Sequence, residues 1–250
     1  MSYKTVFKRY ELKYMITPEQ KEEILLVMSP YMSIDEYGRS TVRNVYLDTD
    51  SYRLIRRSIE KPAFKEKIRL RSYSEVTADG TVFVELKRKY DKTVYKRRIP
   101  LSQRAAMEWV CGNAPCPLTT QISREIDYFL KLYGRLIPTV FLTYEREAYY
   151  DKDGGDFRVT FDDNILCRNT DISLSSPIWG TKILPEEKVL MELKCSGGIP
   201  LWMTRVLSSG KIFKTSFSKY GTAYSKLIFP QIYLPTSKVQ KEKITNGCNF

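Results

Sequence analysis

The chain has 250 residues and 42% of them are hydrophobic, so it can bury a sizeable core in one large domain or two small ones. Lysine and arginine number 41 against 29 acidic residues, and this net charge of +12 indicates an anionic partner: a phosphorylated molecule, polyphosphate, nucleic acid or a membrane surface. The chain contains no histidine, which excludes Ser-His-Asp and Cys-His catalysis and histidine-ligated metals.

Alternating and helical patterns follow one another along the chain without a regular strand-helix order, which argues against a parallel sheet. Thr17-Pro18-Glu19 is typical of a helix start. The sequence predicts one domain over 1–230 and a polar tail over 231–250. Strands are predicted at 5–16, 41–49, 64–72, 82–89, 92–101, 137–150, 156–163 and 188–195, and helices at 17–28, 51–59, 102–110, 119–132, 200–208 and 218–228.

The five cysteines (Cys111, Cys116, Cys167, Cys195 and Cys248) are scattered and lack the pairing that a zinc site needs. Reduced thiols are therefore expected. The start of the chain lacks the apolar core of a signal peptide, and the longest apolar cluster, ILLVM at 24–28, is too short to cross a bilayer. These features predict a cytoplasmic protein, with membrane association left open only through a partner.

Several predicted strands divide into an apolar face and a charged face, because successive side chains point to opposite sides. In 64–72, Ile68 and Leu70 oppose Lys67, Arg69 and Arg71. One explanation is a sheet with its charged face in water. The other is a barrel that places apolar side chains outside, under helices, and charged ones inside, where a polyanion compensates them. The poor mixing of signs favours the second: an α+β fold with an antiparallel, roughly eight-stranded β-barrel and flanking helices.

Eight short motifs occur in order along the chain: RYELKY (9–14), YLD (46–48), KIRLR (67–71), FVELK (83–87), YER (144–146), RVTFD (158–162), LMELK (190–194) and FSKY (217–220). With them the chain resembles, from about Tyr3 to Leu227, the catalytic domain of the VTC (vacuolar transporter chaperone) family. These domains are polyphosphate polymerases of the triphosphate tunnel metalloenzyme, or CYTH-like, superfamily.

The resemblance implies a charged tunnel in which the γ-phosphoryl group of ATP is transferred onto a growing polyphosphate chain, with Mn²⁺ or Mg²⁺ as cofactor. It implies ATP or another triphosphate and polyphosphate as ligands, and it leaves open a membrane-protein partner. Arg9 stands where many tunnel relatives have the first glutamate of E-x-E-x-K. By position, the implied catalytic cations are Lys13, Arg69, Arg71, Lys87, Arg146, Arg158 and Lys219; the implied substrate-binding residues are Arg9, Lys67, Lys89, Lys194 and Ser218; and the metal ligand is Glu192, with Glu11 as the weaker candidate.

Other interpretations stay open. The same cations and metal serve a tripolyphosphatase or nucleoside triphosphatase, and a sensor of polyphosphate or nucleotide needs no catalysis. The sequence shows no Walker motif and no recognised RNA-binding motif, so side chains are expected to grip the phosphates and no specific nucleic acid binding is expected. Glu192 has an alternative role as a partner of Lys194, and Ser218 as a helix cap.

Overall fold

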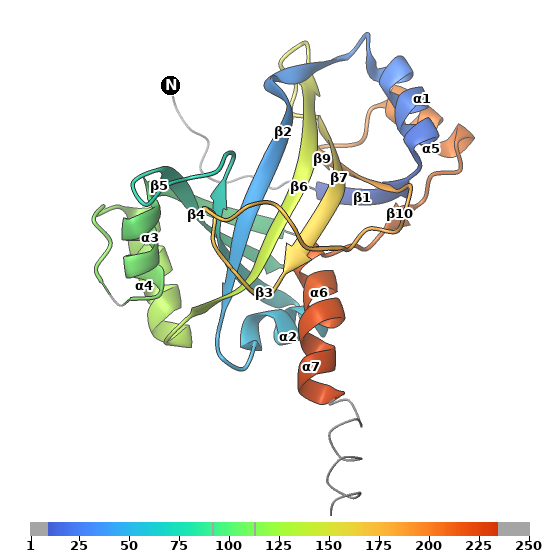
Figure 1. Ribbon diagram of the computed structural model, residues 1–250. Coiled ribbons are helices and arrows are strands. Elements are labelled where there is room, and N and C mark those ends of the chain that lie inside the picture. Colours follow the sequence, from blue (N-terminus) through green and yellow to red (C-terminus); the bar gives the residue numbers. More distant parts are fainter. Residues whose placement is uncertain (1–9, 92, 113, 235–250) are drawn as a thin grey trace, which may run out of the picture.

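A strongly curved antiparallel sheet organises the chain (Figure 1). The computed structural model describes residues 10–91, 93–112 and 114–234. In this part of the chain the sheet has ten strands: nine follow the order β10-β1-β9-β7-β6-β2-β3-β4-β5, and the tenth, β8, pairs with β7. Their bounds are β1 Tyr10–Ile16, β2 Met32–Asp48, β3 Phe64–Ser72, β4 Thr81–Tyr90, β5 Thr93–Ser102, β6 Ile137–Asp151, β7 Arg158–Arg168, β8 Thr181–Lys182, β9 Val189–Cys195 and β10 Lys214–Thr215.

The α+β class, the antiparallel pairing and the flanking helices confirm the prediction, but the backbone ladder does not close. The sheet ends at β5 on one side and at β10 on the other, so within the described residues it is an open, ten-stranded sheet. Its last strand, β10, has only two residues and pairs with β1 alone, which leaves no ladder to reach β5. Side chains cross the gap instead: Lys87 contacts Glu11, and Lys67 contacts Ser218.

The predicted helices form close to their expected positions. Thr17 and Gln20 make a capping box at the start of α1, and Ser102 and Thr120 cap α3 and α4 with their side chains. Buried Asp48 accepts hydrogen bonds from the amides of Leu54 and Ile55 and so orients α2. The helices are α1 Pro18–Met28, α2 Arg53–Ile59, α3 Gln103–Val110, α4 Gln121–Tyr133, α5 Leu201–Ser209, α6 Lys219–Ala223, the π-helix η1 Tyr224–Ile228 and α7 Phe229–Tyr233.

Helices cover the outer, apolar face of the sheet, and this arrangement turns the charged face inward. Ile68 and Leu70 of β3 belong to one buried cluster with Trp109 of α3 and Phe129 of α4. A second cluster joins apolar residues of β1, β7 and β9 to α1 and α5, which lie side by side. The arrangement predicted from strand alternation, with apolar side chains outside under helices and charged side chains inside, is therefore the one that forms.

One end of the interior is closed by α6 and η1. Tyr220 and Ala223 share a buried cluster with Val140 and Leu142, which lie on the same side of β6 as Tyr144 and Arg146. The ring of Tyr220 stacks on that of Tyr46, with centroids 4.4 Å apart. The interior is thus a blind cavity at this end.

The last helical segment runs further than expected. The helix predicted at 218–228 continues through η1 into α7 and ends at Tyr233, so the expected domain boundary at 230 falls within α7. Residues 235–250, the rest of the predicted tail, lie outside the described residues. None of the helices in the described part of the chain is long and apolar enough to cross a membrane.

Candidate functional site: a cationic cavity inside the sheet

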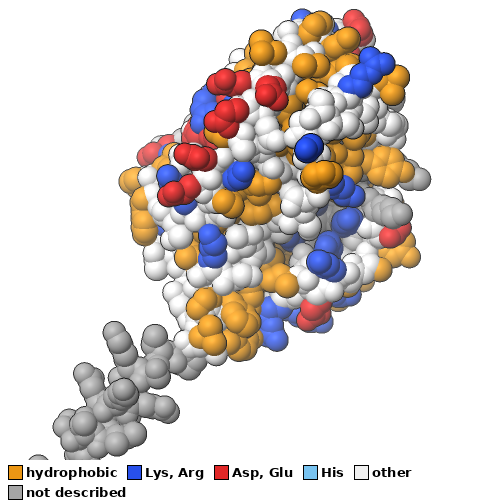
Figure 2. Space-filling view, turned by 90° about the vertical axis from the view of Figure 1, so that its right-hand side faces the viewer, with side chains coloured by type: hydrophobic (Ala, Val, Ile, Leu, Met, Phe, Trp, Pro, Cys, Tyr) orange, Lys and Arg blue, Asp and Glu red, His pale blue; other side chains and the backbone are white. Residues whose placement is uncertain are grey.

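The inner face of the sheet encloses a cavity of about 470 Å³. Figure 2 shows Lys and Arg side chains within a hollow on the face that lies to the right in Figure 1. Nine lysines and three arginines line the cavity, against two glutamates. The cations are Lys13, Lys65, Lys67, Arg69, Arg71, Lys87, Lys89, Lys96, Arg146, Lys194, Lys214 and Lys219, and the carboxylates are Glu11 and Glu192.

Strand register places several of these cations directly opposite one another. Lys67 of β3 pairs with Lys87 of β4, which pairs with Lys96 of β5, and Lys65 pairs with Lys89. Cross-strand neighbours lie about 5 Å apart, and like charges at that distance destabilise a sheet. These pairings carry an electrostatic cost, which a bound polyanion would offset.

Buried Glu85 holds the arginines of one wall. Its carboxylate lies 2.8 Å from Arg69 Nη2, 2.7 Å from Lys96 Nζ and 3.7 Å from Arg71 Nη1. Burial opposes ionisation of Glu85, but Arg69 and Arg71 hold its pKa well below the usual range. Arg69 also donates to the hydroxyl of Tyr46 at 3.0 Å. The two guanidinium groups are thus fixed before any ligand arrives.

On the opposite wall of the cavity, Asp162 is the buried carboxylate that holds cationic side chains in place. Arg146 donates from Nε and Nη2 to its two oxygens at 2.6 and 2.7 Å, and Lys219 Nζ lies 2.5 Å from Oδ2. The Asp162 side chain is fully buried. Burial disfavours its charge, yet Arg146 and Lys219 lower its pKa below the ordinary aspartate value. This bidentate pair orients Arg146 toward the cavity.

Tyr144 lies among these cations. Its hydroxyl accepts a hydrogen bond from Arg71 Nη2 at 3.0 Å, and Lys219 Nζ is 4.5 Å from its ring centroid. Burial raises the pKa of Tyr144, but Arg146 and Arg71 outweigh it and lower the pKa to about 8. The phenol is therefore an easily polarised proton donor at the cavity wall.

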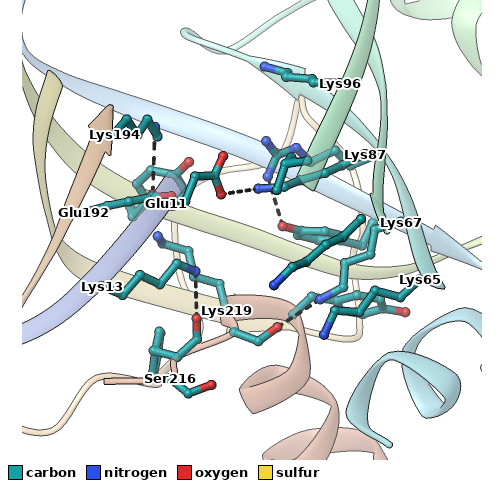
Figure 3. Close-up of a pocket in the computed structure, with 18 of the residues that line it drawn as sticks. Glu11, Lys13, Lys65, Lys67, Lys87, Lys96, Glu192, Lys194, Ser216 and Lys219 are labelled. Carbon is teal, nitrogen blue, oxygen red and sulfur yellow. Dashed lines mark hydrogen bonds and ion pairs between the residues drawn. The ribbon is translucent and has the colours of Figure 1, made fainter. Parts of the chain in front are cut away.

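The two cavity carboxylates lie on the adjacent strands β1 and β9. Lys13 pairs with Glu192 and Glu11 pairs with Lys194, so charges alternate in both directions (Figure 3). Burial opposes the ionisation of Glu192, while Lys194 and Lys13 hold its pKa well below the usual range. Glu192 is therefore an ionised carboxylate facing the cavity, as a hard metal ion requires.

A protein-only metal cage is absent from the described residues, where no group of three or more histidine, cysteine, aspartate or glutamate side chains is placed to hold an ion. Mg²⁺ and similar ions are commonly bound by one or two carboxylates together with substrate phosphates. Glu192 and Glu11 fit that second type of site, in which phosphate oxygens complete the coordination.

The structure brings most of the residues expected from the sequence to one cavity. Ser218 caps α6, accepting from Gly221 N, and it also lines the cavity, where it accepts from Lys67 Nζ at 3.0 Å; its contact with substrate stays a prediction. Arg9 lies outside the described residues. The expected residues that line the cavity are Lys13, Lys67, Arg69, Arg71, Lys87, Lys89, Arg146, Lys194, Ser218, Lys219, Glu11 and Glu192.

Arg158 is the expected residue that the structure places elsewhere. It is exposed at the start of β7 and does not line the cavity. It shares a face with Asp162, but four residues of strand separate the two by about 13 Å. Arg158 pairs across the sheet with Lys194, which does line the cavity, so its contact with phosphate stays a prediction.

Several contributors to the cavity, Lys65 among them, were missed as site residues. Lys96 lies on the side of β5 opposite buried Ile99, so strand alternation alone would have found it. Asp162 and Tyr144 belong to the motifs RVTFD and YER, which mark them without indicating a role. Lys214 reaches the cavity through the two-residue strand β10, for which the sequence has no local signal.

Comparisons with known proteins agree with this geometry. A protein from Bacillus halodurans described as a "putative adenylate cyclase" has 14% identity and a TM-score of 0.52, with 86% of this chain and 95% of that chain covered. A Hippeastrum "putative adenylyl cyclase", described as having a dominant triphosphatase activity, has 13% identity and a TM-score of 0.51, with 89% and 98% covered. These likenesses show the fold.

Sequence comparison identifies the family. No curated protein sequence matches the chain. The VTC domain, however, matches residues 8–228, which include the whole sheet and the cavity. The chain belongs to the VTC domain family.

Proposed function

We propose that the protein is a metal-dependent polyphosphate polymerase that transfers the γ-phosphoryl group of ATP onto a growing polyphosphate chain. The observation that carries this proposal is the cavity itself, which presents twelve cations against two carboxylates. A linear polyphosphate has one negative charge or more on each phosphate and is a ligand that can compensate so many cations at once. Membership of the VTC family favours the polymerase among such activities.

Phosphoryl transfer depends on positioning and charge compensation more than on covalent chemistry by the protein. Arg69, Arg71 and Arg146, each fixed by a buried carboxylate, are suited to grip phosphate oxygens in a defined orientation. Lysines supply point charges along the chain. A terminal oxygen of the polyphosphate chain forms a bond to the γ-phosphorus, the bond from that phosphorus to the β–γ bridging oxygen breaks, and ADP leaves.

Glu192, with Glu11 beside it, would hold the divalent cation, for which Mn²⁺ and Mg²⁺ are the candidates. When bound, such an ion draws phosphate oxygens together and offsets the charge that develops during transfer. Lys194, 3.9 Å from Glu192, and Lys13, its cross-strand partner, keep that carboxylate ionised.

A tripolyphosphatase or nucleoside triphosphatase is the second candidate, because the Hippeastrum protein with this fold is described as a triphosphatase. The same cations and metal would act, with water in place of the chain terminus as the acceptor. A sensor that binds polyphosphate without turnover is the third.

The test is to incubate the pure protein with ATP and Mn²⁺ and to follow both free phosphate and polymer length on a gel. A polyphosphate ladder with ADP supports the polymerase, whereas phosphate release without polymer overturns it in favour of the hydrolase. Glu192→Gln should abolish either turnover and spare tripolyphosphate binding. Lys131→Met, an exposed position on α4, is the matched control and should behave as the unaltered protein.

A further inference from the structure

Five lysines of the cavity lack the carboxylate partners that the arginines have. The ion pairs within 4.0 Å found among the described residues include none with Lys13, Lys65, Lys67, Lys89 or Lys214, whereas Arg69 and Arg146 pair with buried acids. Lys13 Nζ donates to the Phe217 carbonyl at 2.7 Å, and Lys67 Nζ donates to the Ser218 hydroxyl at 3.0 Å. Both of these acceptors are neutral, as Figure 3 shows for Lys67.

Of these five lysines, Lys67 is the one surrounded most closely by other cations. Lys87 lies directly opposite it on β4, and Lys65 and Arg69 flank it on its own face of β3. Glu11 on β1 does not compensate the charge of Lys67, because its carboxylate is bound to Lys87. The titratable and charged groups that face it are Lys65 and Arg69 from β3, Lys87 and Lys89 from β4, Lys13 and Glu11 from β1, Glu192 from β9, Lys214 from β10, Lys219 from α6 and Tyr46 from β2.

Such surroundings disfavour the ammonium form of a lysine. Burial and then Lys13, Lys87, Lys65 and Arg69 lower the pKa of Lys67 to about 7, whereas a free lysine has a pKa of 10.5. A phosphate chain in the cavity would reverse the balance, since its oxygens place negative charge beside the amine and accept hydrogen bonds from the ammonium form alone.

We propose that the binding of a polyphosphate anion is coupled to proton uptake, and that Lys67 is the residue that takes up the proton. The inference rests on the proposed function, because it assumes that the cavity binds phosphate chains. The proton passes from solvent or buffer to the amine of Lys67, and no covalent bond of the ligand changes. Lys67 is thus a residue that makes the capture of the polymer depend on pH.

Coupled proton uptake makes affinity fall as pH rises. Each proton taken up on binding lowers the association constant by up to about tenfold per pH unit above the pKa of the empty site. Because Lys67 must take up this proton, the affinity for tripolyphosphate should fall by roughly tenfold as pH rises from about 7.5 to about 8.5. Below about pH 6.5 the contribution of Lys67 should be level, because the amine is already protonated.

Calorimetric titration with tripolyphosphate, without divalent metal, tests the inference at about pH 8. The binding enthalpy is measured in two buffers of different ionisation enthalpy, and its dependence on the buffer gives the number of protons taken up. Lys67→Arg is the informative variant, because a guanidinium keeps the charge but stays protonated at this pH. Subtracting the proton uptake of Lys67→Arg from that of the unaltered protein removes the protons that tripolyphosphate itself exchanges.

The unaltered protein should take up close to one proton more than Lys67→Arg, and the affinity of Lys67→Arg should depend less on pH. Lys67→Met should also lose the uptake, with weaker binding, and Lys131→Met should match the unaltered protein. Equal proton uptake by the unaltered protein and Lys67→Arg, with tripolyphosphate bound in both, overturns this inference and leaves the proposed function standing. Failure of the unaltered protein to bind tripolyphosphate overturns both.

Discussion

Lys87 Nζ lies 2.6 Å from Glu11 Oε2, and this ion pair joins β4 to β1, the strands next to the two edges of the open sheet. A lysine expected to contact phosphate and a carboxylate expected to contact metal therefore neutralise each other. Phosphate and metal must each replace a partner when they bind, so the two ligands should assist one another at this position.

Glu11→Gln tests that coupling. Without its carboxylate partner, Lys87 is free for phosphate, so metal-free tripolyphosphate should bind roughly two- to fivefold more tightly, the range expected from a partly exposed ion pair. Metal-dependent turnover should fall, but less than in Glu192→Gln. Calorimetry and a turnover assay measure the two effects. Weaker metal-free binding in Glu11→Gln would show that the ion pair organises the site instead of blocking it.

Glu85→Gln should destabilise the empty protein strongly. Removing a buried carboxylate that faces Arg69, Arg71 and Lys96 leaves cations without compensation, which costs about 3 kcal/mol in the free energy of unfolding. Urea unfolding measures the loss. Tripolyphosphate should restore part of the stability, because it supplies negative charge to the same cations. Glu75→Gln is the control, since Glu75 also pairs with an arginine, Arg43, but is largely exposed and should change stability little.

Asp162 should make the fold sensitive to acid. Its pKa is held below the ordinary value in the folded protein, so its stabilising effect is present above the unfolded pKa of about 4 and is lost as pH falls toward the folded pKa. Asp162→Asn should be less stable at neutral pH, and its stability should change less between about pH 5 and pH 2. Unfolding followed at several pH values gives both. A profile parallel to that of Asp163→Asn, the next residue along β7, would contradict the prediction.

Lys67 should also make stability rise with pH, but by destabilising the ligand-free protein when protonated, whereas ionised Asp162 stabilises it. The folded pKa of Lys67, about 7, lies below the unfolded value, so the unfolded chain binds more protons and stability rises with pH between about 7 and 10. The rise from this group is up to about 1.4 kcal/mol per pH unit. Lys67→Met should remove it, and the difference between the two unfolding profiles isolates the contribution. A difference that stays constant across this pH range would show that Lys67 is protonated in the empty cavity throughout.

Tyr144 should titrate earlier than the other tyrosines of the chain. With its pKa lowered to about 8, tyrosinate absorbance should appear well before the main rise near 10, and Tyr144→Phe should lose this first step. Saturating tripolyphosphate should move the step to higher pH, because negative charge beside the phenol disfavours tyrosinate. An early step that persists in Tyr144→Phe would assign it to another group.

Sequence patterns were sufficient to assign side chains to the two faces of each strand, but not to tell how far along a strand the cavity extends. Ile68 and Lys67 could be assigned to opposite sides because alternation is a local property of a strand. Arg158 lies on the same side of β7 as Asp162 but is not among the residues that line the cavity, since the extent of the cavity depends on how the whole sheet curves. Lys214 and Ser218 enter the site on a short connection whose course is decided by tertiary contacts with Lys13 and Lys67.

The charged cavity occupies the place where most domains of this size have one central core, and the apolar packing is divided accordingly. Phe129 and Met203 are both fully buried, yet they belong to separate clusters under different helices. Residues without shared contacts contribute independently to stability. The protein should therefore tolerate change under one helical cover without repacking the others, so that the outer shell can diverge in sequence, piece by piece, around an interior whose charges are interdependent.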